Sequence, residues 1–196
     1  MTAEDTLITR RDGRVARILL NRPRALNALN LDMIRAMAKA LDEWRDDPHV
    51  HAVVIEGAGD RAFCAGGDVI NLRDGQMSGD RTEVEQFFGE EYALNLAIAT
   101  YPKPYIALID GICMGGGIGV SVYGPYRVAT EHASFGMPET AIGFFPDIGG
   151  TYFMPRMPGQ IGMYLGLSGL RISGADSVHC GFATHYVPRA DLPALS

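Results

Sequence analysis

The sequence predicts an α/β fold, and two observations carry that prediction. Short apolar runs rich in β-branched residues alternate along the chain with longer amphipathic segments, which gives the order strand, helix, strand, helix. Two of the apolar runs lead directly into glycine-rich loops. The chain of 196 residues is long enough for one domain with its own core, so we expect residues 1–196 to form a single domain.

The N-terminal part is predicted to form a hairpin followed by a helix. Apolar and polar residues alternate on either side of the turn-forming pair Asp12-Gly13, which indicates two paired strands. Asn30 is a suitable N-cap for an amphipathic helix that should end before Pro48. The apolar positions of that helix recur at helical spacing and are Ile34, Ala38, Leu41 and Trp44.

Two buried strands are predicted in the middle of the chain, each followed by a glycine loop. Residues 53–55 form the first strand and lead toward the loop at residues 63–68. A helix is expected over residues 83–99, because prolines follow it closely. Residues 105–109 form the second strand and lead into the loop at residues 115–119. After Gly149 we expect short helices separated by Gly159, Gly174 and Gly181.

Composition and charge exclude several classes of function. A net charge of −6 without a basic cluster argues against nucleic-acid binding, which requires Lys and Arg gathered on one face. No apolar run reaches the roughly 18–20 residues that span a bilayer, so no membrane association is expected. Residues 1–12 lack an apolar signal core, and we therefore predict a cytoplasmic protein.

The cysteines and histidines show no pattern typical of a metal site. Cys64, Cys113 and Cys180 are odd in number and widely spaced, which favours buried reduced thiols over disulfides or zinc ligands. The five histidines lack ligand spacing such as H-E-x-x-H. We expect no bound metal.

The two glycine loops are candidates for binding a developing negative charge. Glycine allows a backbone N–H to approach a ligand closely, and a following helix N-terminus adds unpaired donors. If the N–H groups of Gly67 and Gly116 converge, they form an oxyanion hole for a carbonyl oxygen. Tight turns and close helix packing would explain the same glycines, and spacing alone does not separate the two interpretations.

Other interpretations of the second loop fit its residues poorly. A dinucleotide-binding fingerprint would place a glycine or alanine where Val120 or Val122 stands. A phosphate-binding P-loop is excluded by the missing Gly-Lys-Ser/Thr ending. A nucleophile elbow at Gly119-Val120-Ser121 would need glycine at Tyr123, so we interpret Ser121 as a helix-packing residue.

Two acidic residues lie eight positions apart in a segment that we expect to be largely buried. Glu139 and Asp147 are accompanied by the apolar residues Phe135, Ile142, Phe144 and Phe145. Burial raises the pKa of a carboxyl group, which suits acid–base chemistry. Each residue also has a purely structural explanation: Glu139 as an N-terminal helix charge after Pro138, and Asp147 as a cap before Gly149-Gly150.

Several motifs together resemble the crotonase superfamily, the enoyl-CoA hydratases and isomerases, over roughly residues 5–190. They occur in that superfamily's order and are Phe63-Cys64-Ala65-Gly66-Gly67-Asp68, Pro102-Lys103-Pro104, Gly115-Gly116-Gly117 and Met137-Pro138-Glu139. The resemblance implies a crotonase-like spiral of β-β-α units with peripheral helices and a bound acyl-CoA. It also implies an oxyanion hole formed by the N–H groups of Gly67 and Gly116.

One departure narrows the resemblance to a branch of the superfamily. Typical enoyl-CoA hydratases carry a glutamate where this sequence has Gly119, whereas Glu139 retains their second glutamate. Asp147 stands where hydratases usually have glycine. The sequence is most similar to the 3-hydroxyisobutyryl-CoA hydrolase branch, which shares the motifs Glu90-Glu91-Tyr92, Ala129-Thr130-Glu131 and Phe145-Pro146-Asp147.

The activity that this resemblance implies is hydrolysis of 3-hydroxyisobutyryl-CoA to 3-hydroxyisobutyrate and CoA, a step of valine catabolism. Coenzyme A is then part of the substrate, and no separate cofactor is expected. Catalysis would rest on the Glu139 and Asp147 carboxylates. The implied substrate-binding residues are Ala65, Gly66, Asp68 and Glu91.

Two alternatives remain open at this point: an enoyl-CoA hydratase or isomerase, and a non-catalytic acyl-CoA-binding module or inactive fragment. The superfamily continues with C-terminal helices that cover the acyl pocket or support trimer contacts. We expect this segment to be absent from residues 1–196, which would leave apolar surface exposed. A homo-oligomer, trimer or dimer, is a further expectation.

Overall fold

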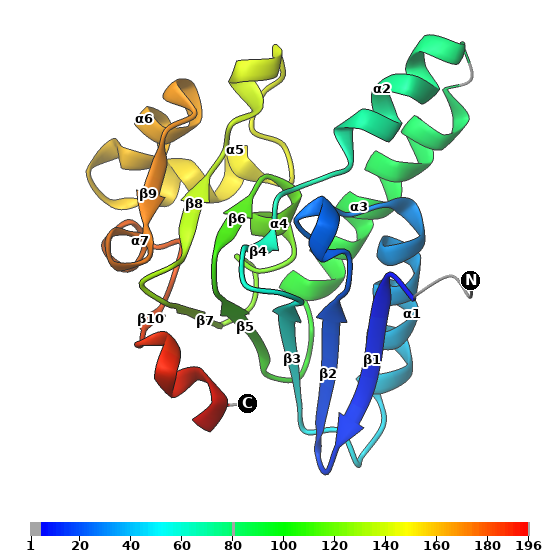
Figure 1. Cartoon of the computed structure of the whole chain (residues 1–196), viewed down its shortest axis with the longest axis vertical. Helices are drawn as coiled ribbons and strands as arrows, with labels where there is room; N and C mark the ends of the chain where they lie inside the picture. The colour runs from blue at the N-terminus through cyan, green and yellow to red at the C-terminus, as the bar shows by residue number, and fades with distance from the viewer. Residues whose placement is uncertain (1–4, 80, 196) are drawn as a thin grey trace.

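The computed structural model describes residues 5–79 and 81–195, and its strands form two sheets (Figure 1). The six-stranded sheet has the order β1-β2-β3-β5-β7-β10 and the four-stranded sheet the order β4-β6-β8-β9. The first contains β1 (Leu7–Asp12), β2 (Val15–Leu20), β3 (Ala52–Gly57), β5 (Tyr105–Ile109), β7 (Tyr126–Ala129) and β10 (His185–Tyr186). The second contains β4 (Ala62–Cys64), β6 (Ile112–Met114), β8 (Ser134–Gly136) and β9 (Arg171–Ser173).

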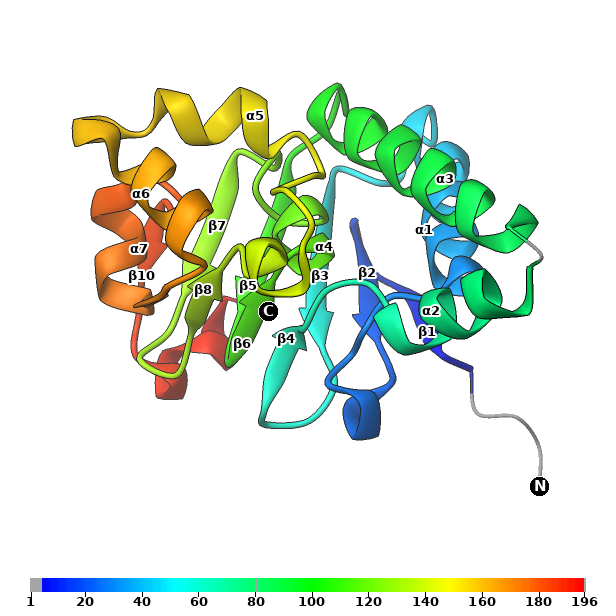
Figure 2. The same cartoon turned by 90° about the horizontal axis from the view of Figure 1, so that it is seen from above.

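The helices form a layer over the first sheet and a second group in the last quarter of the chain. In the first layer, α3 packs across α1, and α1 contacts β1 and β2 (Figure 2). The α-helices are α1 (Leu31–Arg45), α2 (Val69–Ser78), α3 (Thr82–Ala99), α4 (Gly116–Gly119), α5 (Gly150–Phe153), α6 (Ile161–Ser168) and α7 (Gly174–Cys180). The 3-10 helices are η1 (Pro23–Ala25), η2 (Glu139–Ile142), η3 (Met154–Arg156), η4 (Pro158–Gln160) and η5 (Arg189–Ala194).

The middle of the chain repeats one unit, which places a strand in each sheet before a helical segment. The pairs β3–β4, β5–β6 and β7–β8 each contribute their first strand to the six-stranded sheet and their second to the four-stranded sheet. Neighbouring units pair in parallel within both sheets. The predicted α/β fold with its spiral of β-β-α units is therefore confirmed. This winding brings the ends of β4 and β6 together, and both glycine loops follow those ends.

The longer predicted elements are confirmed. β1 and β2 pair antiparallel around the predicted turn, where Gly13 has a φ of +59°. The Asn30 side chain accepts a hydrogen bond from the Met33 amide at 3.0 Å and caps α1. The predicted helix at residues 83–99 is α3, and the two buried strands are β3 and β5.

The segment around the two acidic residues is less buried than predicted. Phe135 lies in the core, but Ile142 is 66% exposed and Phe145 is 58% exposed. The reason is that β8 ends at Gly136, so the chain leaves the sheet and crosses the surface as a 3-10 turn and bends. The Phe144 ring lies at this surface, 5.9 Å from the ring of Phe88 on α3 and 4.6 Å from that of Phe145.

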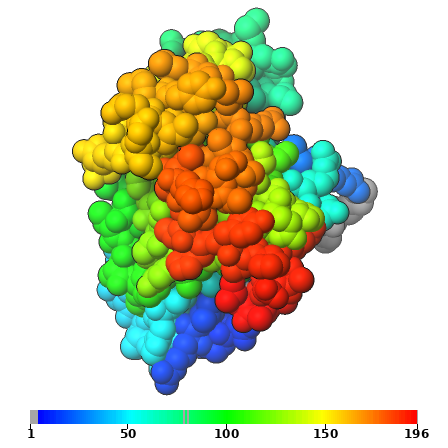
Figure 3. Space-filling view, turned by 90° about the vertical axis from the view of Figure 1, so that its left-hand side faces the viewer, coloured from blue at the N-terminus to red at the C-terminus, as the bar shows by residue number. Residues whose placement is uncertain are grey.

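The surface on one side of the molecule is formed largely by residues after Gly149 (Figure 3). Apolar side chains are exposed on α5 and α6, including Tyr152, Tyr164 and Leu167. The described helices include none with the length and hydropathy needed to cross a bilayer. Residues 1–4, the beginning of the stretch searched for a signal core, lie outside the described residues.

The cysteine prediction is correct for two of the three thiols. All three cysteines are free, and Cys64 and Cys113 are fully buried. Cys180 is only half-buried, because it lies at the C-terminal end of the short surface helix α7.

A buried asparagine fixes the turn that supports the first glycine loop. Asn27 is fully buried in a left-handed conformation with a φ of +55°. Its side-chain amide donates to the carbonyl oxygens of Ala58 and Ala62 at 2.9 and 2.8 Å, and its Oδ1 accepts from the Arg22 amide at 3.0 Å. These bonds tie the η1 turn to the residues on both sides of Gly59.

We predict that Asn27→Ala lowers the free energy of unfolding by about 2–5 kcal/mol, because it leaves buried carbonyl groups without donors. Denaturant unfolding followed by circular dichroism measures this change. Asn21→Ala is the matched control, since it removes one exposed bond to the Asp5 carbonyl and should change stability by less than about 0.5 kcal/mol. Equal losses in the two variants would contradict the role assigned to Asn27.

Candidate active site

The first glycine loop is held in place by a short parallel bridge to the chain after η1. The Leu29 amide donates to the Gly66 carbonyl at 2.8 Å, and the Asp68 amide donates to the Leu29 carbonyl at 2.8 Å. Gly67, between the two, donates no backbone hydrogen bond to the described residues. Its N–H is therefore available to a ligand.

The second glycine loop approaches the first so closely that side chains would not fit. A Cβ atom at Gly117 would collide with the Cys64 carbonyl oxygen, so α4 packs directly on the backbone of β4. A Cβ at Gly116 would lie 3.3 Å from the Gly67 nitrogen, and a Cβ at Gly66 would lie 3.6 Å from the Gly116 nitrogen. Within the described chain, the Gly116 amide also has no backbone acceptor.

The two loops that carry these amides therefore lie in close contact. Two amides that point at one carbonyl oxygen would stabilise it as it gains negative charge. The helix expected after the second loop is α4, and it is short. α4 has only four residues, so the loop amides themselves, rather than a helix dipole, supply the positive potential.

Two buried glutamates flank the second loop. Glu91 on α3 is 2% exposed, and its Oε1 occupies the space that a Cβ of Gly116 would need. Glu139 at the start of η2 is 8% exposed, and its Oε1 would lie 2.8 Å from a Cβ at Gly115. One carboxylate oxygen of each, Oε1 of Glu91 and Oε2 of Glu139, has no hydrogen-bond partner among the described residues.

A third carboxylate is oriented by a tyrosine. The Tyr92 hydroxyl donates to Oδ2 of Asp147 at 2.9 Å. The next residue, Ile148, has a φ of +45°, a left-handed conformation that is costly for a β-branched side chain. The Tyr123 hydroxyl holds this turn by donating to the Ile148 carbonyl at 2.6 Å. The Asp147 side chain does not cap α5, so its structural explanation is not the cap that the sequence suggested.

Burial raises the pKa of all three carboxyl groups, and the charge of Asp147 adds to the effect on both glutamates. Burial, followed by the charges of Asp147 and Glu139, raises the pKa of Glu91 to about 8. Burial raises the pKa of Glu139 to about 7, opposed by a bond to its own amide and aided by the charge of Asp147. Burial also raises the pKa of Asp147, while the Tyr92 hydroxyl lowers it. With a pKa of about 8, Glu91 is mainly protonated at neutral pH.

Gly119 stands where typical hydratases carry a glutamate, and neighbouring side chains occupy the space beside it. A Cβ at Gly119 would lie 3.0 Å from Nδ2 of Asn95 and 3.1 Å from Cβ of Ile148. A longer acidic side chain at this position would need both neighbours to move. The carboxylates at the site are therefore those of Glu91, Glu139 and Asp147.

The remaining predicted residues surround the first loop in supporting positions. The Ala65 amide donates to the Leu26 carbonyl at 3.0 Å, and Gly66 has a φ of +109° that favours glycine. Asp68 caps α2 and forms a 2.8 Å ion pair with Arg22. The Asp68 carboxylate thus has structural partners, and its contact with a substrate stays a prediction.

Sequence reasoning missed three residues of this site: Tyr92, Asn95 and Tyr123. Asn95 lies one turn after Glu91 on the buried face of α3. Two polar residues spaced four apart in an otherwise apolar helix face were the available signal. The tyrosine contacts depend on the turn at Ile148 and have no local pattern.

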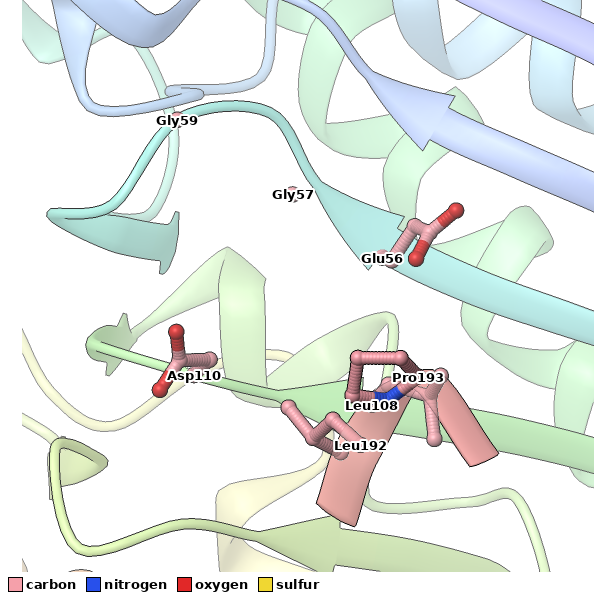
Figure 4. Close-up of a pocket in the computed structure, with 7 residues that line it drawn as sticks. All are labelled: Glu56, Gly57, Gly59, Leu108, Asp110, Leu192 and Pro193. Atoms are coloured by element: carbon pink, nitrogen blue, oxygen red, sulfur yellow. The ribbon is translucent and has the colours of Figure 1, made fainter. Parts of the chain in front are cut away.

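Other parts of the described chain hold no metal cluster, but they do contain a further pocket. Residues 5–79 and 81–195 contain no group of three His, Cys, Asp or Glu side chains placed to hold a metal ion. A pocket of about 200 Å³ between β3, the end of β5 and η5 is lined partly by Glu56 and Asp110 (Figure 4). Asp110 is already bound by Thr130 Oγ1 at 2.5 Å and by Arg189 Nε at 3.0 Å.

Comparison with known proteins identifies the family. Residues 15–196 match the family described as enoyl-CoA hydratase/isomerase. The chain belongs to this family. Its fold agrees with that of solved members: a crystal structure of an enoyl-CoA hydratase from Rhodobacter sphaeroides 2.4.1 matches with a TM-score of 0.94 at 43% identity, covering 97% of this chain and 57% of that chain.

Curated relatives refine the similarity within the family. The chain is 56% identical over 178 residues to the mitochondrial 3-hydroxyisobutyryl-CoA hydrolase of Xenopus tropicalis, covering 91% of this chain and 46% of that protein. It is also 50% identical over 178 residues to the small ribosomal subunit protein mS47 of Neurospora crassa, covering 90% of this chain and 35% of that protein. The chain thus spans about half the length of the curated hydrolases it matches.

The prediction of a cytoplasmic location is wrong. The matched 3-hydroxyisobutyryl-CoA hydrolases from Xenopus tropicalis, Gallus gallus, Rattus norvegicus and Homo sapiens are all named as mitochondrial. The prediction depended on the absence of an apolar signal core. Mitochondrial targeting segments are amphipathic and Arg-rich instead, so that absence did not exclude mitochondria.

We predict that Glu91→Gln has a higher free energy of unfolding than the wild type, and that this difference grows as the pH rises from about 5 to 8. The folded protein keeps the Glu91 proton up to about pH 8, whereas the unfolded chain releases it near 4.5, so stability from the neutral form is lost as the pH rises through this window. Glutamine stays neutral and avoids the loss, which is roughly 1–4 kcal/mol at pH 8. Unfolding free energies measured at several pH values test this.

Glu90→Gln is the matched control on the same helix. Glu90 is exposed and its pKa is lowered by its bond to Arg35, so its removal should not stabilise the protein at pH 8. Parallel pH dependences for the wild type and Glu91→Gln would show that Glu91 is not a buried neutral acid.

Proposed function

We propose that this chain hydrolyses the thioester of 3-hydroxyisobutyryl-CoA, releasing 3-hydroxyisobutyrate and CoA. The observation that carries the proposal is the replacement of the first hydratase carboxylate by Gly119, with Asn95 and Ile148 filling the space beside it. Glu139 and Asp147 are then the carboxylates left for chemistry beside the paired amides. The similarity to curated 3-hydroxyisobutyryl-CoA hydrolases supports the same choice.

In this proposal the thioester carbonyl oxygen accepts hydrogen bonds from Gly67 and Gly116. Neither amide has a backbone acceptor within the described chain, so substrate can bind without first breaking a backbone hydrogen bond of these amides. As the acyl carbon becomes tetrahedral, the oxygen gains negative charge and both bonds strengthen. One such donor is typically worth about 3–4 kcal/mol of activation free energy.

Glu139 performs the chemical step, either by attacking the acyl carbon or by removing a proton from water that attacks it. The bond from the acyl carbon to sulfur breaks, and the CoA thiolate takes up a proton. If Glu139 attacks, water then hydrolyses the resulting anhydride, which releases the acid and restores the carboxylate. By either route one water is consumed, with a net gain of OH by the acyl group and of H by the thiol. With its pKa near 7, Glu139 exchanges protons readily at neutral pH.

The other two acids have separate roles. Asp147, oriented by the Tyr92 hydroxyl, contacts the hydroxyl of the substrate or assists proton transfer. Glu91 lies against Gly116, where a negative charge would oppose the developing oxyanion. Its pKa of about 8 keeps it mainly neutral at pH 7, so it stabilises the site's shape without that penalty.

Two other activities are tested by the same assay. An isomerase would move the double bond of a 3-enoyl-CoA, with one carboxylate carrying the proton. A non-catalytic protein would bind CoA thioesters without converting them. The 50% identity to a small ribosomal subunit protein favours keeping this second candidate, because that relative is named for assembly into a ribosome rather than for catalysis.

We predict that Glu139→Gln reduces thioester cleavage by at least about 100-fold, because general base or nucleophilic action is lost. Purified chain is incubated with 3-hydroxyisobutyryl-CoA while free thiol is followed with a thiol reagent and the acid by mass spectrometry. A parallel incubation with a 3-enoyl-CoA detects the conjugated product. Glu90→Gln, which makes the same change at an exposed residue, should keep wild-type activity.

The outcomes separate the candidates. Thiol release that depends on Glu139 supports the hydrolase. Undiminished thiol release in Glu139→Gln would overturn the assignment of this residue. Conversion of the 3-enoyl-CoA without thiol release would indicate an isomerase, and saturable binding without turnover of either thioester would indicate a non-catalytic module.

A further inference from the structure

Helix α3 contacts both glycine loops along one row of its side chains. A Cβ at Gly67 would lie 3.0 Å from the buried ring of Phe87, which therefore packs against the first loop. Glu91, four residues later on the same face, lies against Gly116 of the second loop. These contacts fix the helix relative to both loops.

The neighbouring row on α3 contacts the segment that carries the other two acids, residues 139–148, here called the acid segment. Phe88 and Tyr92 are also four residues apart, and their ring centroids are separated by 6.0 Å. The Tyr92 hydroxyl donates to Asp147 near the end of the acid segment. The Phe88 ring lies 5.9 Å from the ring of Phe144 in its middle. One helix therefore contacts the loops and the acids.

The backbone of the acid segment is bonded mainly to itself. Within the described chain, its backbone-to-backbone hydrogen bonds join residues at most five positions apart. One of them links the Phe144 amide to the Glu139 carbonyl at 3.0 Å, so the position of Phe144 affects that of Glu139. Segments that depend on side-chain contacts in this way open at a lower free-energy cost than the strands of a core.

Phe144 has few alternatives to its contact with α3. Its side chain is 36% exposed, and it lines an apolar cavity of about 250 Å³ shared with Met163 and Leu167 of α6. Atoms that face a cavity lack the attraction of close neighbours. The Phe88 ring, by contrast, is supported within its own helix by Phe87, with ring centroids 5.5 Å apart. Phe88 thus joins a loosely packed ring to a fixed one.

We propose that Phe88 is a positioning residue, which holds the acid segment against α3 and so keeps Glu139 and Asp147 beside the glycine loops. The inference rests on the proposed function, in which Glu139 acts on a carbonyl bound by those loops. Misplacing a reacting group by about 1 Å costs up to roughly 100-fold in rate. The loops follow the paired strands β4 and β6, so loss of Phe88 should displace the acids and leave thioester binding intact.

Carboxyl footprinting tests the position of Glu139 without relying on activity. Carbodiimide couples glycine ethyl ester to accessible carboxyl groups, and Glu139 is only 8% exposed. Phe88→Leu should raise the labelling rate of Glu139 by roughly three- to tenfold, the factor expected for loss of one aromatic pair. Mass spectrometry of peptides measures the rate. The Glu131 carboxyl, which is 45% exposed, is the internal reference and should keep its rate.

Steady-state kinetics with 3-hydroxyisobutyryl-CoA test the consequence for catalysis. Phe88→Leu should lower kcat at least roughly fivefold, because Glu139 is no longer aligned, while KM stays within about twofold of the wild type. Phe88→Tyr retains the ring and should keep both the slow labelling and the activity. Phe144→Leu should match Phe88→Leu, and the double variant should be no worse than either, because both changes remove the same contact.

Tyr101→Leu is the matched control for a loss of stability alone. Tyr101 is a half-buried aromatic residue just after α3, where its ring lies 5.3 Å from the guanidinium carbon of Arg45. Its removal should lower the thermal unfolding temperature without faster labelling of Glu139 and without a lower kcat. Thermal unfolding of every variant confirms that it is folded.

The outcomes separate this inference from the proposed function. Unchanged labelling of Glu139 in Phe88→Leu would overturn the role of Phe88, whatever the activity. Faster labelling with unchanged kcat would mean that Phe88 does not position the acids for catalysis, which also overturns the inference. If the wild type does not cleave the thioester, the proposed function fails, while the labelling rates still test whether Phe88 holds the acid segment.

Discussion

The close contact between two stretches of backbone is the constraint on which the rest of the site depends. α4 packs so tightly against β4 that a side chain at Gly117 would collide with the Cys64 carbonyl. The same approach brings the amides of Gly67 and Gly116 together. Such close packing requires the backbone on both sides to be held rigidly. The pairing of β4 with β6 and the hydrogen bonds of Asn27 hold it in place.

The charge of the site depends on which side chains pack beside the two glycine loops. Glu91 takes the space beside Gly116, and Glu139 approaches Gly115. With Asp147 they form a group of carboxyl groups whose pKa values are all raised, chiefly by burial. The left-handed turn at Ile148 holds Asp147 in this group, and two tyrosine hydroxyls stabilise the turn. In the proposed mechanism this arrangement combines a positive site for the carbonyl oxygen with a base able to act near pH 7.

The sequence predicted elements whose signals are local and long. The hairpin, α1 and α3 have alternation, caps or helical periodicity over many residues. The strands β4, β6 and β8 were not predicted, because three residues are too few to show an alternating hydrophobic pattern. Phe144 and Phe145 were expected inside, but hydrophobicity does not reveal where a chain leaves its sheet. The pairing of Tyr92 with Asp147 joins residues 55 positions apart and has no sequence signature of its own.

In the proposed mechanism the Gly67 and Gly116 amides bind one carbonyl oxygen, and the NMR signals of these amides test that binding most directly. The Glu139→Gln form, labelled with ¹⁵N-glycine, is titrated with 3-hydroxyisobutyryl-CoA. Both amide protons should shift downfield along one saturation curve, while Gly13 in the hairpin turn stays unchanged. Saturable thioester binding with unmoved Gly67 and Gly116 signals would contradict the account.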